Sequence, residues 1–235
     1  MSNSHHNRFY IAPGDFSGDT FRISAGELRH FKVKRLQPGD TLTALDGEGG
    51  EFRGEVIRID RGGAQCAVIE TIIHSPPSRK ISLGIGIIRP GALAFACEKA
   101  AELGTWCIIP ILAERSNRVL SQNEIDRLNQ ITLSSMKQSG SYYHSRVLSP
   151  KTIPALFTEY YGIHRFIHTD IGGGSIYDLP DYEEDLLVLV GPEGGFTDDE
   201  VKLMNDFGAV LVSLGGSRLR SETAAVVALG CLFTK

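Results

Sequence analysis

The chain has 235 residues, of which 42% are hydrophobic and 22% charged, and its formal net charge is -4. These values are typical of a globular protein with one large or two modest domains, whose core is large enough to need no disulfides. The slightly acidic balance argues against indiscriminate nucleic-acid binding, although it allows local basic patches.

The first 75 residues have the pattern of short strands separated by turns. Strands are predicted at 9–12, 41–45, 51–59 and 65–73, with one short helix near 25–29. This succession predicts a small β-barrel or sandwich. Residues 75–78 read Ser-Pro-Pro-Ser, a stiff polar connector, so we place a domain boundary there, between 1–75 and 76–235.

A basic run lies within this first part, at residues 29–35. Its alternation predicts a strand with Lys32 and Lys34 on one face and with Phe31 and Val33 on the other. Two interpretations stay open from the residues alone. The run is either a solvated charged edge or a patch that contacts nucleic acid.

After residue 78, apolar runs rich in Ile, Val and Leu alternate with helical patterns. Strands are predicted at 81–88, 106–112, 165–169, 186–190 and 209–214, and helices at 93–103, 121–139, 197–207 and 221–233. Ser121 with Glu124, and Thr197 with Glu200, have the spacing of capping boxes. Buried strands separated by helices predict an α/β fold with a mostly parallel sheet.

The cysteines and histidines show no pattern of a metal or redox site. The four cysteines lack CxxC spacing and stand in apolar surroundings, which predicts buried free thiols: Cys66, Cys97, Cys107 and Cys231. The seven histidines form no metal-ligand spacing with carboxylates or cysteines, so we expect no metal. The polar N-terminus and the lack of a membrane-spanning apolar run favour a cytoplasmic protein.

Three of the predicted strands run into glycine-bearing loops, at 168–174, 191–197 and 213–220. The carboxyl ends of parallel strands are where ligands of α/β proteins bind. The middle loop matches neither phosphate-binding glycine motif. Pro192 removes an N–H there, and Glu193 would repel an anion. The loop therefore favours a neutral or cationic ligand.

The acids beside this loop divide into two groups. Asp198, Asp199 and Glu200 stand in the first helical turn, where carboxylates stabilise the helix dipole. Glu193 precedes the cap and has no such explanation. In the last loop, Arg220 and Glu222 allow a local ion pair beside a Ser221 N-cap, or a part of the ligand site.

Several motifs in order along the chain resemble one family, the 16S ribosomal RNA uridine-N3 methyltransferases (the RsmE family) of the SPOUT, or α/β-knot, superfamily. The motifs are VGPEGGF at 190–196, LG at 214–215, LRSETA at 219–224, EKAAELG at 98–104, IPILAERS at 109–116, MKQS at 136–139, NRFY at 7–10 and RHFKVKRL at 29–36. Ser217 stands where the family usually has a basic residue, and Arg218 where it has an apolar one.

The resemblance implies a PUA-like β-barrel at 1–75 that binds RNA and a C-terminal trefoil-knot domain at 76–235 that binds S-adenosylmethionine. It also implies a homodimer that methylates N3 of a specific uridine in 16S rRNA of the small ribosomal subunit. A methyl donor with a sulfonium group and no phosphate agrees with the charge of the middle loop.

On this basis we assign candidate roles to individual residues. Backbone groups of the three loops are expected to hold the cofactor, with contacts from Thr169, Val190, Gly191, Glu193, Gly194, Leu214, Gly215, Leu219, Ser221, Thr223 and Ala224. Arg220 is the candidate for stabilising the uridine anion, while Glu193 or Glu222 accepts the proton or fixes the cofactor ammonium. The expected phosphate contacts on the barrel are Arg8, Lys32, Lys34 and Arg35.

Two other functions remain open. The first is a methyltransferase of the same superfamily that acts on a tRNA base or a ribose 2′-hydroxyl. The predicted barrel and the GPEGGF form of the loop argue against it. The second is a non-catalytic RNA-binding assembly factor, for which the residues at 217 and 218 are the only support.

Overall fold

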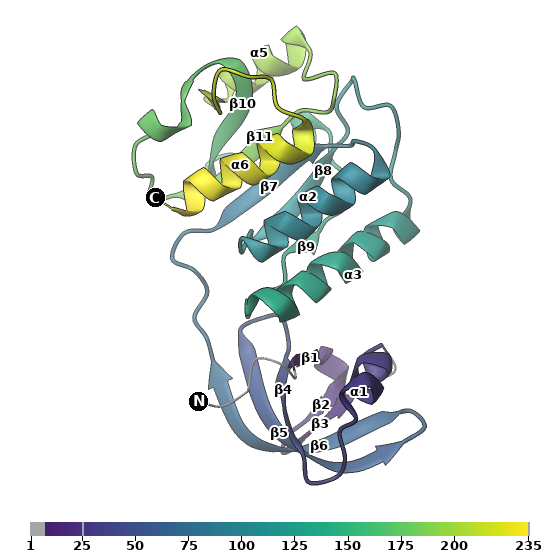
Figure 1. Cartoon of the computed structure of the whole chain (residues 1–235). Coiled ribbons are helices and arrows are strands. Elements are labelled where there is room, and N and C mark those ends of the chain that lie inside the picture. Colours follow the sequence, from purple (N-terminus) through teal and green to yellow (C-terminus); the bar gives the residue numbers. More distant parts are fainter. Residues whose placement is uncertain (1–7, 25, 235) are drawn as a thin grey trace. The chain divides into compact units, whose positions relative to one another are not determined.

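The computed structural model describes residues 8–24 and 26–234. The chain divides into two compact units, Met1–Pro76 with Met136–His144, and Pro77–Ser135 with Ser145–Lys235 (Figure 1). The short excursion of residues 136–144 into the first unit has no counterpart in the predicted boundary. The assignment of domains to 1–75 and 76–235 stays a prediction.

The first unit contains a six-stranded sheet of order β1-β4-β5-β6-β3-β2, in which only the β1–β4 pair is parallel. Its strands are β1 (Arg8–Tyr10), β2 (Phe16–Ser17), β3 (Thr20–Ile23), β4 (Thr41–Leu45), β5 (Gly50–Asp60) and β6 (Gly63–Ile73). A short 3-10 turn, η2, spans Pro13–Asp15. Phe9, Phe21 and Val56 are among the residues that fill the core of this unit. The predicted β-rich N-terminal domain is confirmed.

The basic run is not a strand, and this prediction was wrong. Residues Leu28–Lys34 form helix α1, which ends at Arg35 in the left-handed conformation (φ 54°). The helix forms because Phe31 enters the core, 5.8 Å from the ring of Phe9, whereas Val33 is 71% exposed. Residues two apart on a helix point about 200° apart, so Lys32 and Lys34 do not share a face.

The segment 136–144 is attached to the first unit through the turn between β4 and β5. The backbone N–H of Gly49 donates to the carbonyl of Tyr142, and that of His144 donates to Gly47. The Tyr142 ring stacks on His74 with centroids 3.4 Å apart. Tyr143 donates its hydroxyl to the carbonyl of His74 at 2.8 Å. Backbone pairing and stacking together hold this segment on the sheet.

The second unit is built on a parallel six-stranded sheet of order β12-β10-β11-β7-β8-β9. Its strands are β7 (Ile81–Gly86), β8 (Cys107–Ile111), β9 (Arg146–Val147), β10 (His164–Ser175), β11 (Asp185–Val190) and β12 (Val210–Ser213). All residues of β7 and β8 are buried. The predicted parallel α/β sheet is confirmed.

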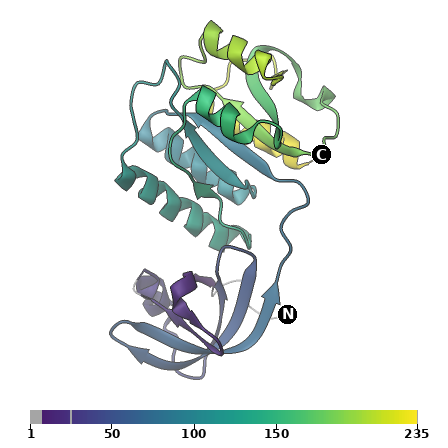
Figure 2. The same ribbon diagram turned by 180° about the vertical axis from the view of Figure 1, so that it is seen from behind.

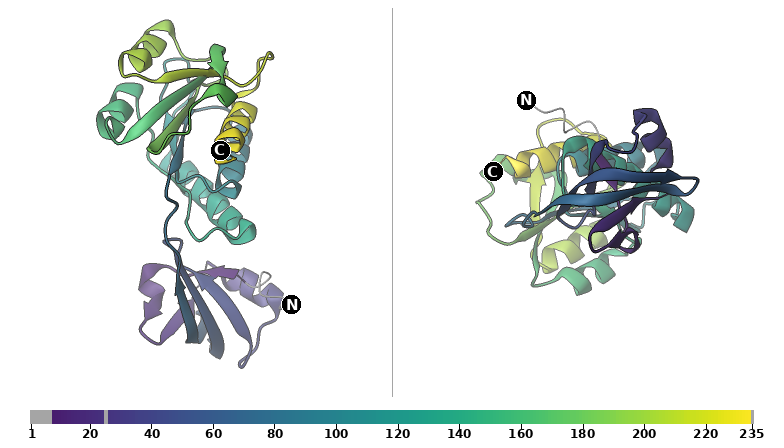
Figure 3. Two further views of the ribbon diagram at one scale, coloured as in Figure 1. Left: turned by 90° about the vertical axis from the view of Figure 1, so that its left-hand side faces the viewer. Right: turned by 90° about the horizontal axis from the view of Figure 1, so that it is seen from below.

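Helices cover both faces of this sheet (Figures 1 and 2, and the left view of Figure 3). The helices are α2 (Pro90–Glu102), α3 (Gln122–Ser139), α4 (Ile153–Tyr160), α5 (Asp198–Asp206) and α6 (Ser221–Phe233), with a 3-10 turn η3 (Ile176–Asp178). Apolar residues of α2, α3 and α6 form one core with the sheet, while α4 and α5 contribute to a second core. Neither α4 nor the two-residue strand β9 was predicted, because both are short.

Because the strands are parallel, their carboxyl ends lie at one edge of the sheet. The loops that follow β7, β8, β11 and β12 therefore gather there. In β10, Thr169 and Gly174 both pair with Val212, so the residues between them bulge out. At Gly173 a Cβ atom would lie 2.5 Å from the backbone of Val212, which requires glycine. The knot implied by the resemblance stays a prediction.

The cysteine prediction is confirmed for three of the four thiols. Cys66, Cys97 and Cys107 are free and buried, and Cys231 is free and half-buried. Burial raises the pKa of Cys66 and of Cys97 to about 12. Among the helices in the described residues, none has the length and apolar character that a bilayer span requires.

Candidate active site

The loop between β11 and α5 is fixed first by its contact with β7. Pro192 lies directly on Gly86, where a Cβ atom would be 2.4 Å from the proline nitrogen. A turn follows, in which the N–H of Gly195 donates to the carbonyl of Pro192 at 2.8 Å. Gly195 has a φ of 71°, in the left-handed region. The proline that looked unsuitable for phosphate binding thus packs the loop onto the sheet.

The side chain of Glu193 contacts Arg89, a residue far from it in the sequence. Its Oε1 accepts a hydrogen bond from the backbone N–H of Arg89 at 3.2 Å and lies 3.6 Å from the Nε of that residue. Arg89 is the N-cap of α2 and provides no side-chain cap of its own. The Glu193 carboxylate therefore satisfies an N–H group at the start of α2 and complements the dipole of the helix.

A second arginine, Arg115, also binds this loop. The Nη1 of Arg115 donates to the carbonyls of Gly194 at 2.9 Å and Phe196 at 3.1 Å. Its side-chain stem passes over Gly194, where a Cβ atom would lie 3.3 Å away. The backbone N–H of Glu114 also donates to Glu200 at 2.8 Å. The loops after β8 and β11 are thereby joined.

The capping box at the start of α5 is confirmed. Thr197 accepts from the backbone N–H of Glu200, whose carboxylate in turn accepts from the backbone N–H of Thr197 at 2.8 Å. Asp198, Asp199 and Glu200 stand in the first turn, as predicted. At Ser121 the pair differs from a capping box. Glu124 accepts from the N–H and the hydroxyl of Ser121, while the backbone N–H of Glu124 donates to the carbonyl of Ser121 at 3.1 Å and not to its hydroxyl.

Ser221 is not the N-cap of α6, in contrast to one of the two interpretations of this segment. Arg220 is the N-cap, with an extended backbone, and Ser221 is the first helical residue and is 7% exposed. The first bond of the helix runs from the N–H of Ala224 to the carbonyl of Arg220. No ion pair joins Arg220 to Glu222 in the part of the chain that the structure describes. The N–H groups of the first turn have no acceptor inside the helix.

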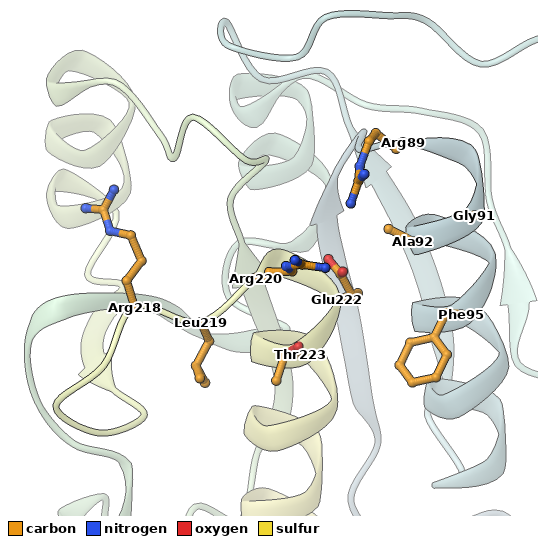
Figure 4. A pocket seen from close by; sticks show the side chains of 9 residues that line it. All are labelled: Arg89, Gly91, Ala92, Phe95, Arg218, Leu219, Arg220, Glu222 and Thr223. Atoms are coloured by element: carbon orange, nitrogen blue, oxygen red, sulfur yellow. The ribbon is translucent and has the colours of Figure 1, made fainter.

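An open pocket of about 730 Å³ lies between the first turns of α2 and α6 (Figure 4). It is lined by Arg89, Gly91, Ala92, Phe95, Arg218, Leu219, Arg220, Glu222 and Thr223. Three guanidinium groups and one carboxylate thus surround it. The α2 side was missed from the sequence, although Pro90, a first helical residue shortly after the buried strand β7 ends at Gly86, was the signal for it.

The predicted site residues fall into three places. Leu219, Arg220, Glu222 and Thr223 line the pocket. Ser221 and Ala224 are buried in the first turn of α6. The remaining residues lie outside the pocket lining. Thr169 stands in the middle of β10, where its bulge begins. The others lie at the ends of β11 and β12 or in the loops beyond them: Val190, Gly191, Glu193, Gly194, Leu214 and Gly215.

The predicted RNA contacts all belong to the first unit. Lys32 and Arg35 are exposed and Lys34 is half-buried. Arg8, by contrast, is only 7% exposed, and its guanidinium lies 5.8 Å from the centre of the Tyr142 ring. Arg8 therefore has a packing contact that leaves little of its side chain for a phosphate.

Comparison with known proteins identifies the family. The sequence profile of the RNA methyltransferase domain matches residues 75–233, and that of the RNA methyltransferase PUA domain matches residues 23–69. The chain belongs to the RNA methyltransferase family. Its resemblance to the ribosomal RNA small subunit methyltransferase E family is confirmed by its relatives, and the first unit is PUA-like.

Two relatives named ribosomal RNA small subunit methyltransferase E illustrate this similarity. The protein from Synechocystis sp. is 28% identical to this RNA methyltransferase over 94% of the chain and 75% of the relative. The protein from Mesomycoplasma hyopneumoniae is 27% identical over 94% and 96%, respectively. The match thus extends over both units.

Two solved structures share the fold. The ribosomal RNA small subunit methyltransferase E of Neisseria gonorrhoeae, bound to S-adenosyl methionine, superposes with a TM-score of 0.89 and 25% identity, covering 98% of both chains. A probable rRNA-methyltransferase from Porphyromonas gingivalis gives 0.83 and 30% identity, covering 97% of both.

Proposed function

We propose that this RNA methyltransferase uses S-adenosylmethionine to methylate N3 of a specific uridine in the 16S rRNA of the small ribosomal subunit. The observation that supports the proposal most is the pocket that brings Arg220 and Glu222 together at the edge of the parallel sheet. The names of the relatives support the coarser part of the proposal, a methyltransferase for ribosomal RNA of the small subunit.

The loops at this edge fit the cofactor chemically. Gly215 has a φ of 135°, and neither Gly215 nor Gly216 has an atom within 4 Å of a Cβ position, so their backbone is open to a ligand. Backbone groups of this kind suit the neutral parts of S-adenosylmethionine. When bound, the cofactor supplies a methyl group on a positively charged sulfur.

Uridine N3 carries a weakly acidic proton that must leave before the nitrogen can accept a methyl group. We assign its removal to Glu222, because this carboxylate lines the pocket, whereas that of Glu193 is occupied by Arg89. Arg220 then stabilises the negative charge that develops on the uridine oxygens. The predicted glycine loop at 168–174 is a bulged part of strand β10. The proposed cofactor contacts remain those at this bulge, in the loops after β11 and β12, and at the start of α6.

The test is a methylation assay on small ribosomal subunits with the methylated nucleoside mapped by mass spectrometry. We expect 3-methyluridine at one position, and we expect Arg220→Ala to lower kcat by about 100-fold or more with cofactor affinity retained. Full turnover in this variant would remove Arg220 from the mechanism. The same assay on tRNA detects the alternative base or ribose methylation. In calorimetric titration with S-adenosylmethionine, an absence of binding would indicate a non-catalytic assembly factor.

The homodimer implied by the resemblance also remains a proposal. Its site would draw RNA contacts from both subunits. Sedimentation velocity of the full chain tests the oligomeric state independently of catalysis.

A further inference from the structure

The pocket between α2 and α6 has an excess of positive charge. Figure 4 shows Arg89 at the start of α2, Arg218 on the loop before α6, and Arg220 with Glu222 at the first turn of α6. Three guanidinium groups therefore stand against one carboxylate among the lining residues. This charge differs from that of the neighbouring glycine loop, which carries Glu193.

Two of the three arginines are free to bind a ligand. Arg89 shares its charge with Glu193. The side chains of Arg218 and Arg220 form no hydrogen bond or ion pair with any other residue that the structure describes. Each of these two guanidinium groups attracts an oxyanion that enters the pocket. The unsatisfied N–H groups of the first turn of α6 act in the same direction.

The apolar part of the lining indicates which oxyanion fits. Phe95 of α2 is 47% exposed, and Leu219 lies on the α6 side. An aromatic ring beside arginines is the combination that proteins use to bind an unstacked nucleotide, whose base stacks while its phosphate pairs with guanidinium. A volume of about 730 Å³ lies within the range of small-molecule sites and accommodates a nucleotide.

We propose that this pocket binds a phosphodiester of the RNA substrate next to the target nucleotide, with Arg218 as a phosphate contact and Phe95 as a stacking surface for a base. The inference rests on the proposed function, because it places RNA at the methylation site. The competing source of the same chemistry is the carboxylate of the methyl donor, so the experiment must separate the two.

The experiment compares Arg218→Ala with Arg127→Ala in the full chain. Arg127 is an exposed arginine of α3 outside the pocket lining, so its loss is the matched change of charge. We expect Arg218→Ala to raise KM for small ribosomal subunits about tenfold and to leave the Kd for S-adenosylmethionine unchanged. For binding to a labelled single-stranded RNA, the slope of log K against log salt concentration should become smaller in magnitude by about 0.7, the value for one phosphate contact.

Two further variants sharpen the result. Arg218→Lys keeps the charge and should retain the salt slope, while Phe95→Ala should raise KM for the small subunit without changing that slope. A weaker Kd for S-adenosylmethionine with an unchanged KM for the subunit would assign the pocket to the donor carboxylate and overturn the proposal. Equal effects of Arg218→Ala and Arg127→Ala would also overturn it.

This result is distinct from a failure of the proposed function. If the wild-type chain produced no 3-methyluridine, the function would be wrong. The RNA affinity and salt slope of Arg218→Ala would still report on the pocket.

Discussion

At the scale of single residues, buried and paired side chains set how the protein responds to pH. His168 lies at the centre of β10, only 1% exposed, with its Nε2 3.2 Å from the Oδ1 of Asn205 on α5. Burial lowers the pKa of His168, and the same cause lowers the pKa of His164. His168 therefore faces the α5 core rather than the pocket.

The sign of the resulting pH dependence follows from the direction of this shift. A histidine of the unfolded chain has a pKa of about 6.5 and takes up a proton below that pH, whereas buried His168 resists protonation. Its contribution to stability is complete above about pH 6.5 and is lost as the pH falls through the lowered pKa. We expect the free energy of unfolding in urea to decrease from pH 7.5 to pH 5, and the decrease to be smaller in His168→Gln. An equal decrease in both proteins would show that His168 does not carry the effect.

At the scale of elements, the loop between β11 and α5 owes its conformation to side chains from other loops. Glu193 ties it to the start of α2, and Arg115 binds two of its carbonyls. The glycines of the loop cannot fix a conformation by themselves, because glycine loses the most conformational freedom on folding. These contacts make Arg115 a positioning residue for the proposed cofactor site.

Removal of Arg115 should therefore act on cofactor binding. We expect Arg115→Ala to raise KM for S-adenosylmethionine about tenfold, with a smaller increase in Arg115→Lys, because the first variant removes two charge-assisted hydrogen bonds. KM for the small subunit and the melting temperature should change little, since the side chain is exposed. The measurement is steady-state kinetics with each substrate varied in turn, with Arg127→Ala as control. An unchanged donor KM would mean that the loop keeps its conformation without Arg115.

At the scale of the whole molecule, the two units have different tasks in the proposed reaction. The PUA-like unit carries exposed Lys32 and Arg35 on or beside α1, far in sequence from the residues of the pocket. Phosphate contacts of such residues supply affinity and salt dependence, whereas the second unit supplies chemistry.

The double variant Lys32→Ala/Lys34→Ala tests this division. We expect weaker binding to small subunits and a logarithmic salt slope reduced by roughly 0.7 for each phosphate that the variant no longer binds. The Kd for S-adenosylmethionine should stay unchanged in calorimetric titration. Because the two lysines point in different directions on α1, the single variants should differ in size. If the slope did not change, α1 would be an ordinary solvated helix.

Local patterns in the amino-acid sequence predict most of the second unit. Short apolar runs identify strands buried on both faces, and α6 was predicted with its bounds at Ser221 and Phe233, because its residues are almost wholly apolar. The capping box at Thr197 and Glu200 was also readable, since its partners are only three residues apart. Ordered motifs were enough to indicate the family.

Features that depend on distant partners follow from the folded chain alone. The run at 29–35 alternates like a strand, but burial of Phe31 against Phe9 makes it a helix. Glu193 lies 104 residues from Arg89 in the chain and Arg115 lies 79 residues from Gly194, so no local pattern predicts either contact. The parallel order of the strands brings these residues to one edge of the sheet. That order gives Glu193 its partner and places a cationic pocket beside it.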